Sequence, residues 1–348
     1  MRVIFSKQKY RKRAPTAKLH AVPRGHPGAR ASALYAKNRV KGSDRQIAGV
    51  FHQNQPHTEM ILLRKKFFYS VVFAIALVAC ARKSEDLTID GYHTSNEVAA
   101  SDLVAYWSFN RDNSEFFTAM LASITRETIV PLKGQIGDAI QLNGAAMAYP
   151  LIPNLSKTDG LPDFTISLWL NIQGQKGINN AFTPVFSIVP SNSADGWGNI
   201  VFGAETGHYK PQSDTLEMRA IMITPTGTRE ENISKPNGSK GSWFLGANKW
   251  SHVVARWNST THQLQIFGDG TSIGGFDDHP AMGALVISTP ALVVIGGLGC
   301  SDLGFMNAPP RSASNPLASF AIDDLRVFNK ALSDAEVLAL LHLGKAGK

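Results

Sequence analysis

Residues 164–171 read Phe-Thr-Ile-Ser-Leu-Trp-Leu-Asn, and this stretch decides the fold class. From Phe164 to Leu170 an aliphatic or aromatic side chain takes every second position, as in an antiparallel strand with one face in a core. The same period of two runs from Leu103 to Phe109. Further strands are expected at residues 139–142, 185–189, 216–223, 250–257, 263–267, 291–295 and 320–328. Many short strands without alternating helices predict an all-β sandwich or barrel.

One helix is expected, close to the end of the chain. Ser333 and Glu336 have the spacing of a capping box, in which each side chain bonds a free amide of the first turn. Val337 and the leucines that follow it form an apolar stripe at helical spacing. Gly344 is placed to end the helix. Such a short helix is expected to pack on the sandwich.

The segment from Met60 to Cys80 has the pattern of a secretory signal. Arg64, Lys65 and Lys66 precede thirteen almost entirely apolar residues at 67–79, which is short of the roughly 20 that span a bilayer as a helix. The Leu-Val-Ala before Cys80 resembles the lipobox of bacterial lipoproteins, in which that cysteine is lipidated and becomes the mature N-terminus. We therefore expect a protein of the cell envelope that is anchored by lipid at Cys80, in preference to a short transmembrane anchor.

The residues on either side of this signal are expected to lack a fold. Residues 1–59 carry 13 Lys or Arg and two acids, which indicates either a nucleic-acid-binding arm or, as we favour, an upstream extension translated from a wrong gene start. Residues 81–101 are mostly polar and predict a flexible tether. Lys83-Ser84-Glu85-Asp86 resembles the export signal of Bacteroidetes lipoproteins, which implies the outer membrane and exposure at the cell surface.

Charge and cysteine content change once this leader is set aside. The whole chain has a formal charge of +8, but residues 81–348 contain 19 Lys or Arg and 25 acids, a net charge of −6. No nucleic-acid partner is therefore expected. Of the two cysteines, Cys80 is assigned to lipid, so Cys300 has no disulfide partner and is expected to be a small buried residue.

An ordered set of short motifs points to one family. They lie at residues 103–110, 137–144, 164–171, 250–255, 265–270, 295–297 and 322–336. Together they resemble the laminin-G-like (LamG/pentraxin) branch of the concanavalin A-like lectin/glucanase superfamily, over residues 102–343, with 344–348 as a tail. The resemblance implies a jelly-roll of two curved antiparallel sheets with a concave face, followed by the short C-terminal helix.

The resemblance also implies a structural Ca²⁺ near the first and last strands. Asp323 is expected on the same strand face as Ala321 and Leu325, where an unpaired carboxylate would cost several kcal/mol. Members of the superfamily often hold Ca²⁺ there, and Asn110 and Asp112 are the matching oxygen-bearing residues. The alternative is an Asp323 that is held only by hydrogen bonds.

Catalytic motifs are missing from the sequence. Glucanases of the superfamily place two carboxylates on one strand in a Glu-x-Asp-x-x-Glu motif, which this chain lacks. Adjacent Asp323 and Asp324 are expected on opposite strand faces, and Glu230-Glu231 in a solvated polar loop. Nor does the chain contain Gly-x-Ser-x-Gly, His-Glu-x-x-His or a phosphate-binding loop. The sequence predicts a non-catalytic protein, with a glycoside hydrolase of unrecognised site as a weaker possibility.

Aromatic and polar residues gather off the strands between Pro190 and Asp214, and this loop is the predicted ligand site. The residues concerned are Asn192, Asp195, Trp197, Asn199, His208 and Tyr209. Their alternative role is to pack the loop onto the sheet. We predict a lectin-like glycan-binding or adhesive domain with a polysaccharide or glycoconjugate as partner. The alternative is a structural protein-interaction module that binds a surface protein.

Overall fold

The computed structural model describes residues 87–173, 182–205, 214–234, 241–312 and 317–348. The leader 1–59, the signal 60–80 with Cys80, and the Lys83–Asp86 segment lie outside these ranges and stay predictions. Within the described ranges, no helix is long and apolar enough to cross a membrane.

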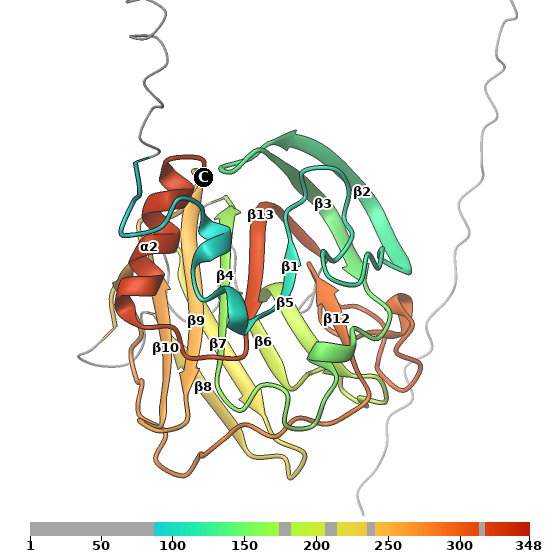
Figure 1. The fold of residues 1–348 in the computed structure, drawn as a ribbon. Helices are drawn as coiled ribbons and strands as arrows, with labels where there is room; N and C mark the ends of the chain where they lie inside the picture. The colour runs from blue at the N-terminus through green and yellow to red at the C-terminus, as the bar shows by residue number, and fades with distance from the viewer. Residues whose placement is uncertain (1–86, 174–181, 206–213, 235–240, 313–316) are drawn as a thin grey trace, which may run out of the picture. The chain divides into compact units, whose positions relative to one another are not determined.

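Thirteen strands and one C-terminal α-helix make up the described fold (Figure 1). The strands form one curled antiparallel sheet in the order β11-β10-β9-β4-β13-β3-β12-β5-β6-β7-β8, with β1 on β13 and β2 on β3. Their bounds are β1 Leu103–Trp107, β2 Ile124–Lys133, β3 Asp138–Ala148, β4 Phe164–Asn171, β5 Phe182–Pro190, β6 Ile200–Glu205, β7 Glu217–Ile223, β8 Arg229–Ile233, β9 Ser251–Asn258, β10 Gln263–Gly268, β11 Thr271–Ser272, β12 Ala291–Ile295 and β13 Ala318–Phe328. The all-β prediction is confirmed.

The sheet curls around one large apolar core. Trp107 lies at its centre, with its ring centroid 5.4 Å from Tyr149 and 6.0 Å from Phe186. Residues from β6, β9 and β10 reach the same core, among them the fully buried Phe202 and Trp257. Alternate residues of each strand therefore face either this core or the outer side of the sheet, and the outer side carries the polar sites described below.

Helix α2 (Asp334–Lys345) covers part of that outer side at β9, β10 and β13 (Figure 1). The predicted capping box is present, since Ser333 Oγ accepts from the Glu336 amide and the Glu336 carboxylate accepts from the Ser333 amide. The prediction that Gly344 ends the helix is wrong. Gly344 lies in the last turn, where a Cβ would be 2.5 Å from the Trp169 ring, so the glycine allows close packing of α2 on β4.

The prediction of a flexible tether over residues 81–101 is wrong for its C-terminal part, from Leu87 onward. Val98 and Ser95 are buried, and Ile89 and Tyr92 pack against the cluster formed under α2. The Arg326 guanidinium donates to Ser95 Oγ at 2.9 Å. A few apolar side chains in a polar segment are enough to dock it, so residues from Leu87 onward belong to the domain.

The expected faces of β13 also differ, because the strand is bulged. The β13–β4 register shifts between Asp323 and Arg326, and Asp324 has a φ of 49°. Ile322 before the bulge and Leu325 after it both face the core. Asp323 pairs with Trp169 on the outer side, so the prediction that it shares a face with Leu325 is wrong.

Candidate functional site

Asp323 lies in a buried polar layer between the sheet and α2. Its Oδ2 accepts from the Ile136 amide at 2.8 Å, while its Oδ1 is buried without a hydrogen-bond partner. Burial raises the pKa of the Asp323 carboxyl to about 7, against an opposing hydrogen bond from Ile136. A cation or a proton on Oδ1 would offset the free-energy cost of burying this oxygen without a partner.

His252 belongs to the same layer, with Nε2 2.8 Å from Ser167 Oγ. Burial lowers the pKa of His252 to about 4, so the ring is neutral near pH 7. Both side chains are almost fully buried. This serine–histidine pair therefore has no access to a substrate and acts as part of the packing under the helix.

The residues predicted to bind Ca²⁺ are only partly brought together. Asn110 Oδ1 accepts from the Asp138 amide at 2.7 Å, so Asn110 and Asp323 bond the same β2–β3 turn at positions two residues apart. Asp112 instead accepts from the amide and hydroxyl of Ser114 in its own loop. Among the described residues no group of three or more His, Cys, Asp or Glu is placed to hold a metal ion. The unpartnered oxygen of Asp323 fits a cation ligand, and the Ca²⁺ site stays a prediction.

Trp197 lies on the outer side of the sheet over β5, β6 and β7, and we call this surface the Trp197 face. Its ring is stacked with that of Phe182 at a centroid distance of 5.7 Å. Val201 and Ile221, which point away from the main core, lie in the same cluster. The guanidinium carbon of Arg229 lies 5.1 Å from the centroid of the Trp197 ring. The indole remains partly exposed.

Charged side chains border the Trp197 face. Arg219 donates to Glu205 at 2.6 Å and to Glu231 at 2.5 Å. Arg229 reaches the same Glu231 oxygen at 3.3 Å. Glu230-Glu231 thus lies on β8 and not in a solvated loop, which corrects the expectation. The network fixes Arg229 beside the indole and leaves a side chain that is 41% exposed.

The turn before β6 contains two other predicted residues, of which Asp195 is bonded to Trp197. Asp195 Oδ1 accepts from the Trp197 amide at 3.0 Å, and Asp195 and Asn192 are exposed. Asn199 is buried and bonds both backbone groups of Ser288, so its role is structural. His208 and Tyr209 lie outside the described residues.

Sequence reasoning missed Phe182 and Arg229, which complete the Trp197 face. They lie fifteen and thirty-two positions from Trp197 along the chain and come together only because β5 to β8 are neighbours. No signal pointed to strand β8, because its residues Arg-Glu-Glu-Asn-Ile lack the alternation of apolar side chains that predicts a strand. Edge strands of this kind carry charge on their exposed side.

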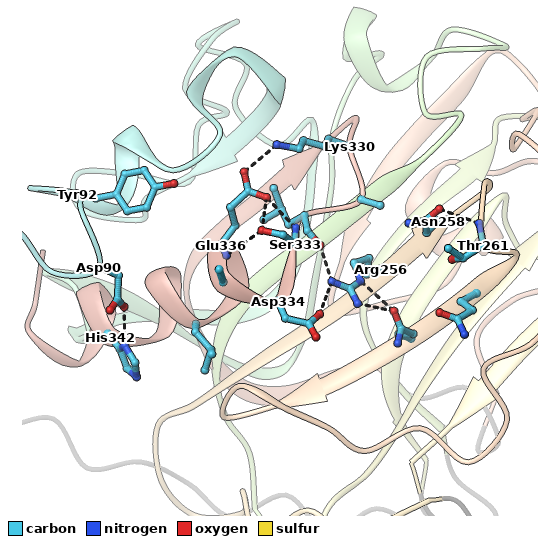
Figure 2. A pocket seen from close by; sticks show the side chains of 16 residues that line it. Asp90, Tyr92, Arg256, Asn258, Thr261, Lys330, Ser333, Asp334, Glu336 and His342 are labelled. Carbon is cyan, nitrogen blue, oxygen red and sulfur yellow. Dashed lines mark hydrogen bonds and ion pairs between the residues drawn. The ribbon is translucent and has the colours of Figure 1, made fainter.

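A separate polar hollow of about 840 Å³ lies at the start of α2 (Figure 2). Its floor is the outer side of β9 and β10, and Arg256 reaches across it to Gln265, the Leu332 carbonyl and Asp334. Lys330 is paired with Glu336 at 2.7 Å. These charged side chains are therefore paired with one another inside the hollow.

Solved structures of other proteins show a limited similarity to this chain. The binding domain of Paraclostridial Mosquitocidal Protein 1 is 14% identical, with a TM-score of 0.47 over 69% of this chain and 52% of that one. Domain 4 of AbnA, a GH43 arabinanase from Geobacillus stearothermophilus solved with arabinotriose, is 17% identical, with a TM-score of 0.43 over 69% and 98%. The Trypanosoma rangeli sialidase is 14% identical, with a TM-score of 0.44 over 70% and 33%.

The chain spans about half the length of the first of these structures. Comparison with curated protein sequences found no match. Residues 144–338, more than half of the chain, match the family Laminin_G_3, described as the concanavalin A-like lectin/glucanases superfamily. The predicted family is confirmed, and the chain belongs to the concanavalin A-like lectin/glucanase superfamily.

Proposed function

We propose that this protein is a lipid-anchored, non-catalytic glycan-binding protein of the cell envelope. The observation that carries the proposal is the Trp197 face, where a partly exposed indole lies beside Arg229 and the exposed Asp195. Specific sites for small ligands combine apolar or aromatic contact surface with a few fixed polar groups. A sugar ring suits this combination, because it presents C–H groups on its face and hydroxyls around its edge.

The rigidity of the Trp197 face supports the same function. The ring is held by Phe182, and Arg229 is held by Glu231, so little side-chain freedom remains to be lost on binding. The polysaccharide or glycoconjugate partner would contact the exposed part of the indole. Asp195 and Asn192, in the turn that precedes Trp197, are exposed hydrogen-bonding groups.

The location of the protein is proposed from the sequence, since Cys80 would carry the lipid. Six residues lie between Cys80 and Leu87, where the domain begins, and a chain of this length spans ~25 Å at most. A glycan-binding domain on so short a connection would act close to the membrane that holds it. The Lys83–Asp86 segment supports a location in the outer membrane with exposure at the cell surface.

A glycan array probed with the full chain in detergent tests the binding function. We expect Trp197→Ala to weaken binding of the recognised glycans at least tenfold, which is about 1.4 kcal/mol. Arg229→Gln, which keeps the packing of the indole, should weaken it by a smaller factor. Trp243→Ala is the matched control, because Trp243 is a 37% exposed tryptophan outside the Trp197 cluster. A wild-type chain that binds no glycan would refute the function and favour a protein-interaction module.

A further inference from the structure

Residues 108–123 connect β1 to β2 (Figure 1). This segment is organised around a buried carboxylate. Glu115 is fully buried, and its two oxygens accept from the amides of Tyr106, Phe117 and Thr118 at 3.0, 3.2 and 2.8 Å. The Thr118 hydroxyl adds a fourth bond at 2.7 Å. The Phe116 amide also bonds the Tyr106 carbonyl. A carboxylate with this many donors fixes the loop in one conformation.

This fixed loop exposes large aromatic side chains. Phe116 is 66% exposed and Phe117 is 49% exposed, with ring centroids 5.3 Å apart. Exposed aromatic rings on a rigid loop are informative because the core does not need them. Phe116 and Phe117 nevertheless differ in one respect, since only Phe116 lines the hollow described next.

The hollow has a volume of about 400 Å³, and its other walls are polar except at Ala119. Asn110, Arg111 and Asp112 line it together with Ser108. The volume is near the lower end of the roughly 300–1,000 Å³ of small-ligand sites. It suits a short ligand of one or two rings and not a long chain.

The hydrogen bonds of the loop fix what the hollow offers to a ligand. Asn110 Oδ1 is occupied by the Asp138 amide, so the side-chain NH₂ of Asn110 is the group left to donate. Asp112 Oδ1 is occupied by Ser114, which leaves Oδ2 to accept. Arg111 offers further donors.

We propose that the Phe116 hollow is a second saccharide subsite, which binds one or two neutral sugar residues. The sugar face contacts the Phe116 ring, and its hydroxyls bond to Asn110 and Asp112. A neutral sugar is favoured because Arg111 and Asp112 offset each other and no net charge is left for an ionic ligand. The inference rests on the proposed glycan binding of this chain but uses residues separate from the Trp197 face.

Titration calorimetry of the full chain with cellotriose, xylotriose and mannotriose, together with the glycan array, tests the subsite. We expect Phe116→Ala to weaken binding of at least one neutral glycan tenfold or more, and Asp112→Asn to weaken the same glycan. Phe117→Ala is the matched control and should stay within twofold of wild type. Equal affinity of wild type and Phe116→Ala for every glycan, or equal losses in Phe116→Ala and Phe117→Ala, would overturn the subsite.

Two further comparisons distinguish a failure of the second subsite from a failure of the proposed function. If Trp197→Ala abolishes all binding while Phe116→Ala changes none, the proposed function stands and the second subsite falls. If the wild-type chain binds no glycan, the proposed function itself falls. Binding should persist in EDTA, because Asn110 and Asp112 contact the sugar directly. Loss of binding in EDTA would make them cation ligands and overturn the inference.

Discussion

Replacing Asp323 by Asn is expected to change how the stability of this protein depends on pH. In the wild type the pKa of Asp323 is raised from 3.8 to about 7 by burial. Stability from this group is therefore fully present below pH 3.8 and is lost as the pH rises through 7. At 1.36 kcal/mol for each tenfold change in proton affinity, the loss amounts to at most about 4 kcal/mol.

His252 has the opposite effect over nearly the same interval. Burial lowers its pKa from 6.5 to about 4, so its contribution is present above pH 6.5 and is lost as the pH falls through 4. The same conversion gives about 3 kcal/mol. Both side chains are buried, so solvent screens neither effect. In the wild type the two terms oppose each other, and stability should change little between pH 4 and 6.5.

Asp323→Asn removes one of these terms and keeps the acceptor for the Ile136 amide. The variant should gain about 3 kcal/mol between pH 4 and 6.5, the full His252 contribution, and should exceed the wild type in stability above pH 7. Urea unfolding followed by tryptophan fluorescence at a series of pH values measures both curves. Asp159→Asn is the control, since this carboxylate is exposed and lies outside the candidate sites, and it should leave the wild-type profile nearly unchanged.

A wild-type curve that rises as steeply as that of Asp323→Asn would refute the reasoning, because it would mean an ordinary pKa for Asp323 in the folded protein. The same titration tests the Ca²⁺ prediction. A bound cation would keep Asp323 ionised, so Ca²⁺ should make the wild-type curve rise with pH and EDTA should restore the flat one. Identical wild-type curves in Ca²⁺ and EDTA would exclude Asp323 as a calcium ligand.

Two further substitutions test the packing around this layer. Gly344→Ala adds about 1 kcal/mol of helix propensity but places a methyl 2.5 Å from the buried Trp169 ring, so thermal unfolding should show a net loss of about 1–2 kcal/mol. The control is Gly283→Ala, which has open space at its Cβ and should cost nothing. A stabilised Gly344→Ala would contradict the packing argument. Arg326→Met leaves the buried carboxylate of Asp324 without its cationic partner, although the Tyr106 hydroxyl still donates to it, and should cost about 3–5 kcal/mol in urea unfolding. The double variant with Asp324→Asn should recover at least half of this loss, and no recovery would show that the charge is not the cause.

The candidate sites could be predicted from the sequence to very different degrees. Asp195 and Trp197 are two positions apart, so their proximity follows from the chain itself. Arg229 joins them through strand pairing. Glu115 gave no sign in the sequence of being buried, because a single glutamate in a polar stretch resembles ordinary surface. Its four hydrogen bonds exist only once the loop has closed around it.

The sequence by itself determined the fold class, the family and the capped helix, since alternation of apolar residues, turn residues and the capping box act over a few neighbouring positions. Tertiary structure decided the rest. It placed Asp323 on the outer side through a bulge, used Gly344 for helix–sheet contact and docked residues 87–101 on α2. These outcomes depend on which distant surfaces meet, because the energetic effect of burying a charge or a glycine is set by the atoms that surround it.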